Sequence, residues 1–404
     1  MPRRETLQMS LRSCEGRYES ASPIQRLDKY VFVCLETHRS KGHTSRKEGE
    51  RNAMKILFAL AALLWNVSPC WAQGGLPAAA NRVSGVPHAE SKTFRILRPG
   101  TMSIIARDPQ TGELGVAVES HFFSVGPVCP WAEAGVGAVA TQAIAEPLYG
   151  QLGLEMMRYG KDAPAVLKAL LAADSASEIR QVAMIDARGN VGAHTGSKIT
   201  PAAGHLIGRN YSVQANTMSS EKVWPAMARA FERNKGDLVD RLLAALEAGQ
   251  EAGGDIRGQQ TAAIIVVNGT STGRPWEDRI FDLRVEDSPQ PITELRRLVR
   301  LQRAYRFTLK GEDLASQKNW DQAIGSYRKA VEMAPEKEEL RYGLATTLLE
   351  AGRDEESLPV FRQVFREHPI WVEITKRNVI SGDLPNDPPR IQRVLDQAVV
   401  GDRK

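Results

Sequence analysis

The pattern of apolar and polar positions changes character along the chain. From Thr101 onward, short apolar runs of strand length alternate with pairs of longer segments in which apolar residues recur at helical spacing. Two such runs, beginning at Thr101 and Leu114, flank the sequence Asp108-Pro-Gln-Thr-Gly112. Proline and glycine supply turn backbone angles there, so residues 101–121 are expected to form a β-hairpin. Further strands are expected at 135–141, 181–186, 190–195, 211–216, 261–267 and 279–285, and helices at 147–159, 163–173, 221–233 and 238–252.

From Leu301 the pattern becomes helical and repeats every 34 residues, which is the period of the tetratricopeptide repeat. Small residues recur where helices would cross, an aromatic residue recurs on the second helix, and a proline follows it. The matching pairs are Gly311 and Ala345, Ala323 and Ser357, Tyr327 and Phe361, and Pro335 and Pro369. Two repeats are fewer than the usual minimum of about three. They are therefore expected to pack on the preceding domain or to be capped by a helix over 292–303 and the segment after 370.

Length and charge narrow the class of protein. The chain has 404 residues, of which 42% are hydrophobic, enough for one large core or two moderate ones. The net charge of +5 comes from an excess of lysine and arginine before Met54, and the rest of the chain is nearly balanced. No basic stripe is interleaved with aromatic residues, so nucleic-acid binding is not expected.

Residues 54–72 have the pattern of a secretory signal peptide. A lysine precedes the apolar run 56–64, and the segment ends in Cys70-Trp71-Ala72. Because the run is shorter than the ~20 residues that span a bilayer, no stable membrane span is expected; a buried apolar helix or a lipoprotein are the alternatives. Residues 1–53 are then interpreted as a disordered upstream extension and 73–97 as a linker or pro-segment. The mature protein is expected to be periplasmic or secreted.

Cysteine and histidine spacing gives no sign of a disulfide or a metal site. After removal of the signal only Cys129 remains, and its expected role is that of a small packed residue. His121, His194 and His205 lack the spacing of metal ligands. We therefore expect no metal and no cofactor, and structural roles for these histidines, with His121 also kept as a catalytic candidate.

Gly100-Thr101 at the head of the first strand is the main candidate for chemistry. A threonine hydroxyl needs an adjacent base to act as a nucleophile, and cleavage of the Gly100–Thr101 bond would create one. The new α-amine has an ordinary pKa of about 7.7–8.0. This is the logic of N-terminal-nucleophile (Ntn) hydrolases. The same residues also suit an ordinary strand start, and Thr101 stays internal after signal removal, so activation needs a second cleavage.

Several segments resemble a bacterial family called domain of unknown function 1028. They are Thr101–Ser120, Val125–Gln142, Arg180-Gln-Val-Ala-Met-Ile-Asp186, Tyr211-Ser-Val-Gln-Ala-Asn216 and Ala252-Gly-Gly-Asp-Ile-Arg-Gly-Gln-Gln260. The resemblance implies an Ntn-hydrolase-like fold. We therefore expect an α+β protein with a four-layer αββα Ntn-hydrolase-like sandwich over residues 98–290. A small all-α tetratricopeptide-like domain would follow over 291–390, with a tail over 391–404.

The same resemblance leaves the reaction open, because the family's chemistry is unassigned and fold does not settle function. Proteasome-type Ntn hydrolases carry a lysine on the third strand that lowers the pKa of the amine. The expected third strand, 135–141, has none. Longer members of the family resemble this chain in the helical part, which implies a protein partner or peptidoglycan.

Polar residues on the strands expected to face Thr101 complete the candidate site. On the strand after the hairpin turn, Glu119 and His121 share one face and Ser120 lies on the other. The hairpin register decides which face meets Thr101, and a slip of one residue exchanges them. Glu119 and His121 are the catalytic candidates, with a solvated carboxylate as the alternative for Glu119. Ser120 and Gln142 are candidates for substrate binding.

Two further groups of polar residues extend the site. Gln214 and Asn216 share a strand face with Ser212. Their amides either stabilise a developing oxyanion, as catalytic residues, or form an ordinary hydrogen-bonded ladder. Asp255 and Arg257 lie in a glycine-rich turn. They either bind a substrate carboxylate or close the loop as an ion pair.

Two functional hypotheses follow from these observations. The first is a secreted Ntn-type amidohydrolase that uses Thr101 on a small amide or peptide-like substrate, with the helical tail as an interaction module. The second is a non-catalytic protein whose Ntn-like pocket binds a ligand and whose tail docks a protein or peptidoglycan. A homo-oligomer stays open under both. Whether the Gly100–Thr101 bond is cut discriminates between them.

Overall fold

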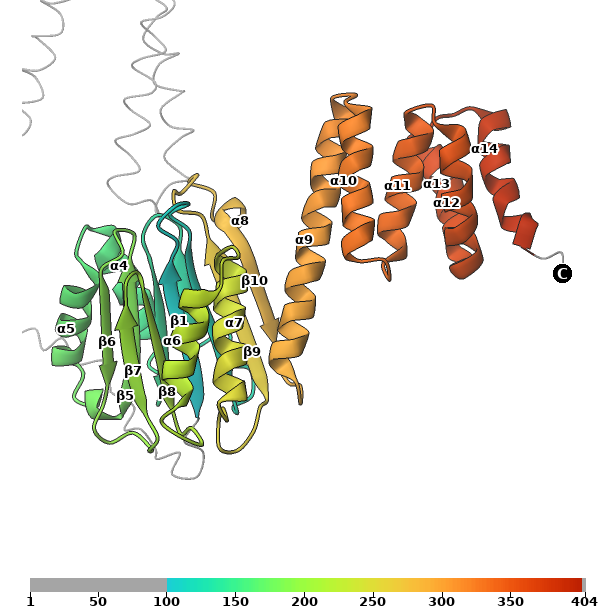
Figure 1. Ribbon diagram of the computed structural model, residues 1–404. Helices are drawn as coiled ribbons and strands as arrows, with labels where there is room; N and C mark the ends of the chain where they lie inside the picture. Colours follow the sequence, from blue (N-terminus) through green and yellow to red (C-terminus); the bar gives the residue numbers. More distant parts are fainter. Residues whose placement is uncertain (1–99, 402–404) are drawn as a thin grey trace, which may run out of the picture. The chain divides into compact units, whose positions relative to one another are not determined.

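The computed structural model describes residues 100–401, which form a mixed α/β region followed by a series of helices (Figure 1). The interpretations of residues 1–53, 54–72 and 73–97 lie outside the described residues. Between residues 100 and 401, no helix has both the length and the apolar character needed to cross a bilayer.

A six-stranded sheet positions the candidate nucleophile. Its strand order is β10-β9-β2-β1-β8-β7, and every neighbouring pair is antiparallel. The strands are β1 (Thr101–Arg107), β2 (Leu114–Ser120), β7 (Gly204–Gly208), β8 (Tyr211–Asn216), β9 (Thr261–Val267) and β10 (Arg279–Val285). Thr101 therefore begins a central strand, with Ser120 opposite on β2 and Asn216 opposite on β8.

A second, four-stranded antiparallel sheet faces the first. Its strands, in order, are β3 (Pro130–Glu133), β4 (Gly137–Ala143), β5 (Arg180–Asp186) and β6 (Val191–Thr195). Side chains from both sheets form the apolar core between them, including Ile105 and Val116 from one sheet and Ala140 and Ile185 from the other. The two sheets are thus packed face to face.

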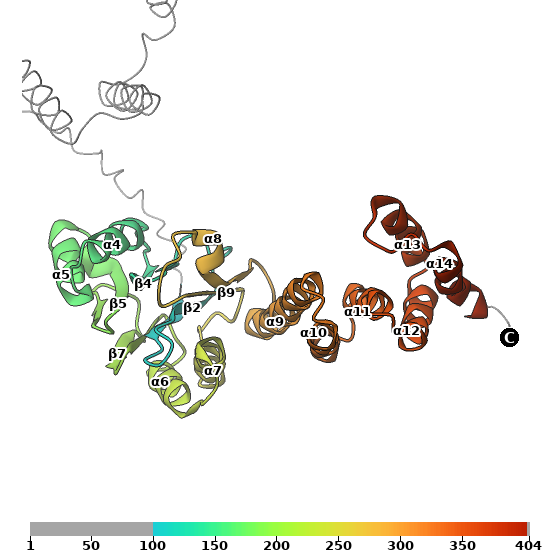
Figure 2. The same cartoon turned by 90° about the horizontal axis from the view of Figure 1, so that it is seen from above.

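A helix pair covers the outer face of each sheet. Helices α4 (Leu148–Arg158) and α5 (Ala163–Ala173) pack on the four-stranded sheet, and α6 (Val223–Arg233) and α7 (Leu238–Glu251) pack on the six-stranded sheet. In the view from above, the order is helix pair, sheet, sheet, helix pair (Figure 2). Because both faces of β1 and β2 are covered, their residues are almost all buried.

Local sequence explains the β1–β2 hairpin. Asp108 Oδ1 accepts hydrogen bonds from the backbone N–H groups of Gln110 (2.8 Å) and Thr111 (3.0 Å), and Gly112 has a φ of +78°. This turn fixes the register in which Thr101 pairs with Ser120.

The structure adds elements that the sequence pattern did not predict. They are the strands β3 and β7, the short helix α8 (Pro275–Asp278) and a 3₁₀ turn over Ser177–Ile179. Strand β4 also begins two residues later than expected, because Gly135 has a φ of +70° and lies in the turn before it. Strand β7 has no buried residue, so it lacks the alternation of a half-buried strand.

The helical region consists of α9 (Pro291–Ser316), α10 (Trp320–Met333), α11 (Glu338–Glu350), α12 (Asp354–Glu367), α13 (Ile370–Ser381) and α14 (Pro388–Leu395). The helix expected over 292–303 is the first part of the 26-residue helix α9. Ile292 and Leu295 of α9 join the core under the six-stranded sheet, and Ala304 packs with residues of α10. The repeats are therefore joined to the α/β region by one continuous helix.

The repeated aromatic positions lie between helices, as the spacing predicts. Tyr327 is buried, and a Cβ on Gly311 or Gly343 would come within 2.7 or 2.5 Å of its ring. Phe361 is fully buried and meets the ring of Tyr342 edge-on at 5.7 Å. The domain end expected at residue 390 falls inside α14, and the buried residues of this helix, Ile391 and Val394, lie beyond it. The tail predicted over 391–404 is in part this helix.

Candidate functional site

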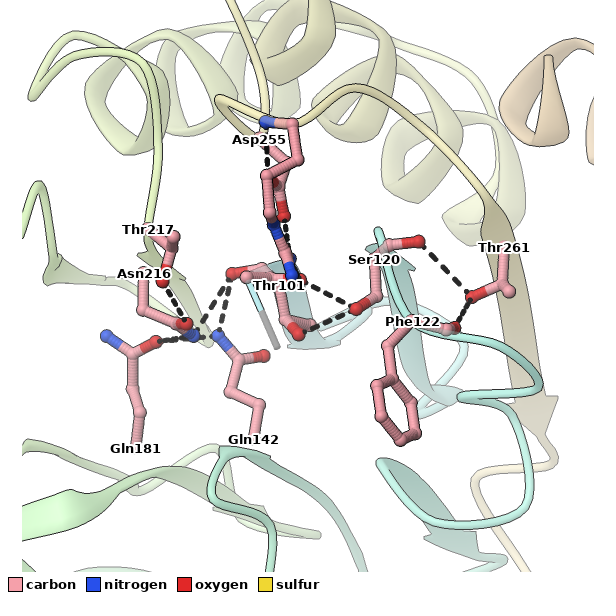
Figure 3. A network of polar contacts seen from close by, with 11 residues as sticks. Thr101, Ser120, Phe122, Gln142, Gln181, Asn216, Thr217, Asp255 and Thr261 are labelled. Carbon is pink, nitrogen blue, oxygen red and sulfur yellow. Dashed lines mark hydrogen bonds and ion pairs between the residues drawn. The ribbon is translucent and has the colours of Figure 1, made fainter. Parts of the chain in front are cut away.

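The hairpin register places Ser120 on the face of the sheet that carries Thr101. Thr101 lies opposite both Ser120 and Asn216, and these three side chains point toward the four-stranded sheet (Figure 3). Glu119 lies opposite Met102, and Met102 belongs to the core on the helix-covered face. The open question of the register is thus answered in favour of Ser120, and Glu119 does not share the face of Thr101.

A chain of two hydroxyl groups links Thr101 to the peptide carbonyl before it. Ser120 Oγ donates to the Gly100 carbonyl oxygen at 2.6 Å, and Thr101 Oγ1 lies 3.0 Å from Ser120 Oγ. Because the single hydroxyl hydrogen of Ser120 is used on Gly100, Thr101 must donate to Ser120. The Gly100–Thr101 bond is therefore flanked by a hydroxyl on its own threonine and a proton donor on its carbonyl oxygen.

Two amide side chains hold the backbone of Thr101 from the other side, and a third accepts a hydrogen bond from each of them. Gln142 Nε2 and Asn216 Nδ2 both donate to the Thr101 carbonyl oxygen, at 3.2 and 3.3 Å. The same two nitrogen atoms lie 2.7 and 3.0 Å from Oε1 of Gln181, on β5. Sequence reasoning missed Gln181. It lies on the inward face of β5 with Ala183 and Ile185, so a polar residue at an inward position was the available signal.

Gln214 takes part in a neighbouring, fully buried ladder. Its Nε2 donates to Ser103 Oγ at 2.6 Å, and Ser103 donates to Gln142 Oε1 at 2.6 Å. Ser212 donates to Gln214 Oε1 at 3.0 Å. Of the two alternatives for Gln214, the structure shows the hydrogen-bonded ladder, and its amide does not point at the Gly100–Thr101 bond.

Asp255 and Arg257 form an ion pair around Gly100. Arg257 Nη2 lies 2.6 Å from Asp255 Oδ2, and the Asp255 side chain is fully buried. The same Arg257 nitrogen lies 3.5 Å from the Gly100 carbonyl oxygen. A Cβ at position 100 would come within 2.1 Å of Asp255 Oδ2, so this site accepts only glycine without rearrangement. The loop-closing ion pair expected as one alternative is present, and it closes over the candidate scissile bond.

Glu119 is buried on the opposite face without a hydrogen-bond partner for either carboxyl oxygen among the described residues. Burial raises its pKa well above the ordinary value, and the negative charge of Asp255 adds to the shift. The Arg257 charge and the nearby Gln260 backbone act in the opposite direction. This shift favours the neutral, protonated form of the carboxyl group. His121 follows β2, and its Nδ1 has no hydrogen-bond partner in the described part of the chain.

An apolar cavity of about 290 Å³ lies beside Thr101 and Gln142. One wall comes from the segment after β2, which includes Phe122 and Val128, and another from the segment after β4, which includes Ile144. The cavity provides space for a small ligand next to Thr101.

Cys129 also lines this cavity, and the expectation of a small packed residue is confirmed. It is almost fully buried, and burial raises the pKa of its thiol to about 12, so it stays protonated. His194 contacts the carbonyl of Ser177, and His205 contacts the hydroxyl of Thr195, as structural histidines do. Within residues 100–401, no group of His, Cys, Asp and Glu side chains is arranged to hold a metal ion.

Comparison with known proteins gives the family. A model described as a family of unknown function, DUF1028, matches residues 101–295. A crystal structure of a Silicibacter pomeroyi protein, titled as a DUF1028 family model, is 30% identical and aligns with 49% of this chain and 84% of its own, with a TM-score of 0.45. The chain belongs to the DUF1028 family.

The DUF1028 match begins at Thr101 itself, the first residue of β1. A tetratricopeptide repeat model matches residues 314–369, which confirms the expected repeat and suggests that this region mediates protein–protein interaction. No curated protein matches the chain significantly. The family name therefore identifies the domain and leaves its reaction to be inferred from the site.

Proposed function

We propose that the DUF1028 domain is an Ntn-type amide hydrolase in which Thr101 becomes the nucleophile once the Gly100–Thr101 bond is cut. The observation that carries the proposal is the hydrogen-bond chain from Thr101 Oγ1 through Ser120 Oγ to the Gly100 carbonyl oxygen. The stacking of a helix pair, two antiparallel sheets and a second helix pair supports an Ntn-hydrolase-like sandwich. The start of the family match at Thr101 supports it as well.

The proposed first step is an intramolecular attack. Thr101 Oγ1 bonds to the carbonyl carbon of Gly100 as its proton passes to Ser120 Oγ, whose own proton moves to the carbonyl oxygen. The guanidinium of Arg257 adds positive charge near that oxygen. The carbon–nitrogen bond then breaks, the nitrogen takes up the proton, and an ester joins Gly100 to Thr101. Water hydrolyses the ester to a Gly100 carboxylate and a free threonine hydroxyl.

The cut would leave Thr101 with an α-amine next to its own hydroxyl. That amine can take the hydroxyl proton when Thr101 attacks the carbonyl of an amide substrate, because its ordinary pKa is about 7.7–8.0. Gln142 and Asn216 already fix the Thr101 carbonyl, so they hold the nucleophile in place. Once Gly100 has left, the Asp255–Arg257 ion pair lies beside the position of the amine.

The mass of the purified protein tests this proposal. The wild-type chain is expected to show a new amino terminus at Thr101 and to hydrolyse members of a broad panel of small amides. Thr101→Ala should remove both properties, and Thr101→Ser should retain part of each, because serine keeps the hydroxyl. Thr347→Ala, which removes a buried threonine from the helical region, is the matched control. An active, uncut Thr101→Ala protein would exclude Thr101 from the mechanism.

A second candidate function, a non-catalytic ligand-binding protein, is favoured by one specific observation. The side chain of Thr101 is almost fully buried, and the amides of Gln142, Gln181 and Asn216 satisfy one another and the Thr101 carbonyl. Under this alternative the Gly100–Thr101 bond stays intact in every variant. Ligand affinity would then be the same for wild-type protein and Thr101→Ser.

We also propose that the protein acts in the periplasm or outside the cell. The support is the pattern of residues 54–72 in the sequence. A chain that starts at Met54 should be exported and should mature at Gln73. Retention in the cytoplasm with an intact amino terminus would contradict the proposal.

A further inference from the structure

The cavity beside Thr101 differs from the rest of the site in its chemistry. The surroundings of Gly100 are charged, because Asp255 and Arg257 enclose it. The cavity walls are apolar, and the polar groups that reach it come from Thr101, Thr141, Gln142 and the Cys129 thiol. Burial keeps that thiol protonated. Thr101 thus lies between the charged surroundings of Gly100 and the uncharged cavity.

We propose that this cavity binds an uncharged, apolar acyl group of the amide substrate, in the form of an aliphatic chain. The assignment rests on the proposed function, because it names the substrate class of the same site. An acyl group stays bonded to Thr101 Oγ1 through the covalent intermediate while the amine departs. A cavity that borders Thr101 directly therefore suits the group that stays. An ionised group would lose its hydration there without gaining a partner.

The size of the cavity sets the length of the chain. A volume of about 290 Å³ is at the small end for ligand pockets. The cavity therefore suits an acyl chain of medium length better than a bulky group.

The backbone conformation of the cavity walls independently supports the assignment of the cavity as a binding site. Ser124 and Ala143 have φ values of +55° and +65°, which residues other than glycine rarely adopt. Ser124 lies in the segment between β2 and β3 that supplies one wall, and Ala143 itself lines the cavity at the end of β4. Such conformations cluster at binding sites, where surrounding contacts maintain them.

Binding of simple amides to the full chain tests the assignment without requiring turnover. The probes are butanamide, hexanamide and octanamide, together with N-butylacetamide and N-hexylacetamide, which are isomers of hexanamide and octanamide with the chain on the amine side. Calorimetry on wild-type and Thr101→Ala protein should show the dissociation constant falling about fourfold per methylene along the acyl series. The N-alkyl isomers should bind at least tenfold more weakly.

Two variants at the walls locate the binding. Ala145→Phe should fill the cavity and weaken octanamide at least tenfold, whereas Ala172→Phe, at an exposed position of α5, should have no effect. Val128→Ala should enlarge the cavity, so that the dissociation constant continues to fall with each added methylene up to a longer chain. This variant replaces Ala145→Phe as the test if Ala145→Phe does not fold.

Three results would overturn the assignment: affinity independent of chain length, tighter binding of the N-alkyl isomers, or octanamide binding unchanged in both wall variants. Chain-length-dependent binding by a protein that stays uncut and hydrolyses no amide would refute the proposed function alone. Cleavage at Gly100–Thr101 and turnover of polar amides only would refute the acyl assignment alone.

Discussion

Ser120 and Glu119 follow one another on β2 and are both fully buried, yet their surroundings differ. The Ser120 hydroxyl lies between the hydroxyl of Thr101 and the carbonyl of Gly100. The Glu119 carboxyl has no hydrogen-bond partner among the described residues, and burial raises its pKa. One step along a strand exchanges the two faces of a sheet. Two residues that are adjacent in the sequence can therefore have different roles, and the hairpin register decides which of them faces Thr101.

The largest difference between the two positions is expected in the cleavage rate. Ser120→Ala removes the donor on the Gly100 oxygen and should slow cleavage by about 10²–10³-fold, the usual effect of removing one such donor. Glu119→Gln should change the rate by less than about threefold, because Glu119 lies on the other face. Intact mass followed over time after refolding measures both. Equal slowing of cleavage in the two variants would contradict the different roles assigned to Ser120 and Glu119.

A smaller difference is expected in stability. Asn216→Ala removes the donor shared by the Thr101 carbonyl and Gln181, so it should lower the free energy of unfolding by about 1–3 kcal/mol. Glu119→Gln, at an equally buried position, should leave that free energy unchanged or raise it at neutral pH, because no hydrogen bond is lost. Denaturant unfolding of both variants provides the measurement. A loss at position 119 as large as at 216 would show that the carboxyl is well paired.

A third difference is expected in the pH dependence of stability. The folded protein raises the pKa of Glu119 above its ordinary value of 4.5, so it binds a proton that the unfolded chain has released. The free energy of unfolding should therefore fall as pH rises above 4.5, by at most about 1.4 kcal/mol per pH unit, until the raised pKa is passed. Glu119→Gln should flatten this slope. If the stabilities of wild-type protein and Glu119→Gln change in parallel from pH 5 to 8, the fold does not raise the pKa of Glu119, and its carboxylate is in contact with water.

Much of the fold follows from the sequence because its strands and helices are long and regularly patterned. The β1–β2 hairpin is specified by the turn chemistry of Asp108–Gly112, and the 34-residue spacing specifies the repeat. Strands β3 and β7 could not be predicted in this way. Strand β3 has four residues and begins with a proline, and β7 lies at a sheet edge with most of its side chains exposed.

The candidate site was predictable only in part, because it depends on register and on contacts between sheets. The pattern selected Thr101 as a candidate and grouped Gln214 with Asn216. It could not separate the hydrogen bonds of Gln214 within the ladder from the contact between Asn216 and the Thr101 backbone. Gln181 comes from the opposite sheet, 35 residues away from Asn216. No local pattern reports which side chains meet across the space between two sheets.

The contacts of the Gly100 carbonyl also bear on when the protein would become active. Ser120 is 20 residues away along the chain and Arg257 is 157 residues away, so the oxygen meets both only after the α/β domain has assembled. A nascent or misfolded chain would not bring these groups together and would keep its peptide bond. Under the proposed function, cleavage is thus a checkpoint on folding, and the fraction of cut chains in a preparation reports the fraction that has reached the native state.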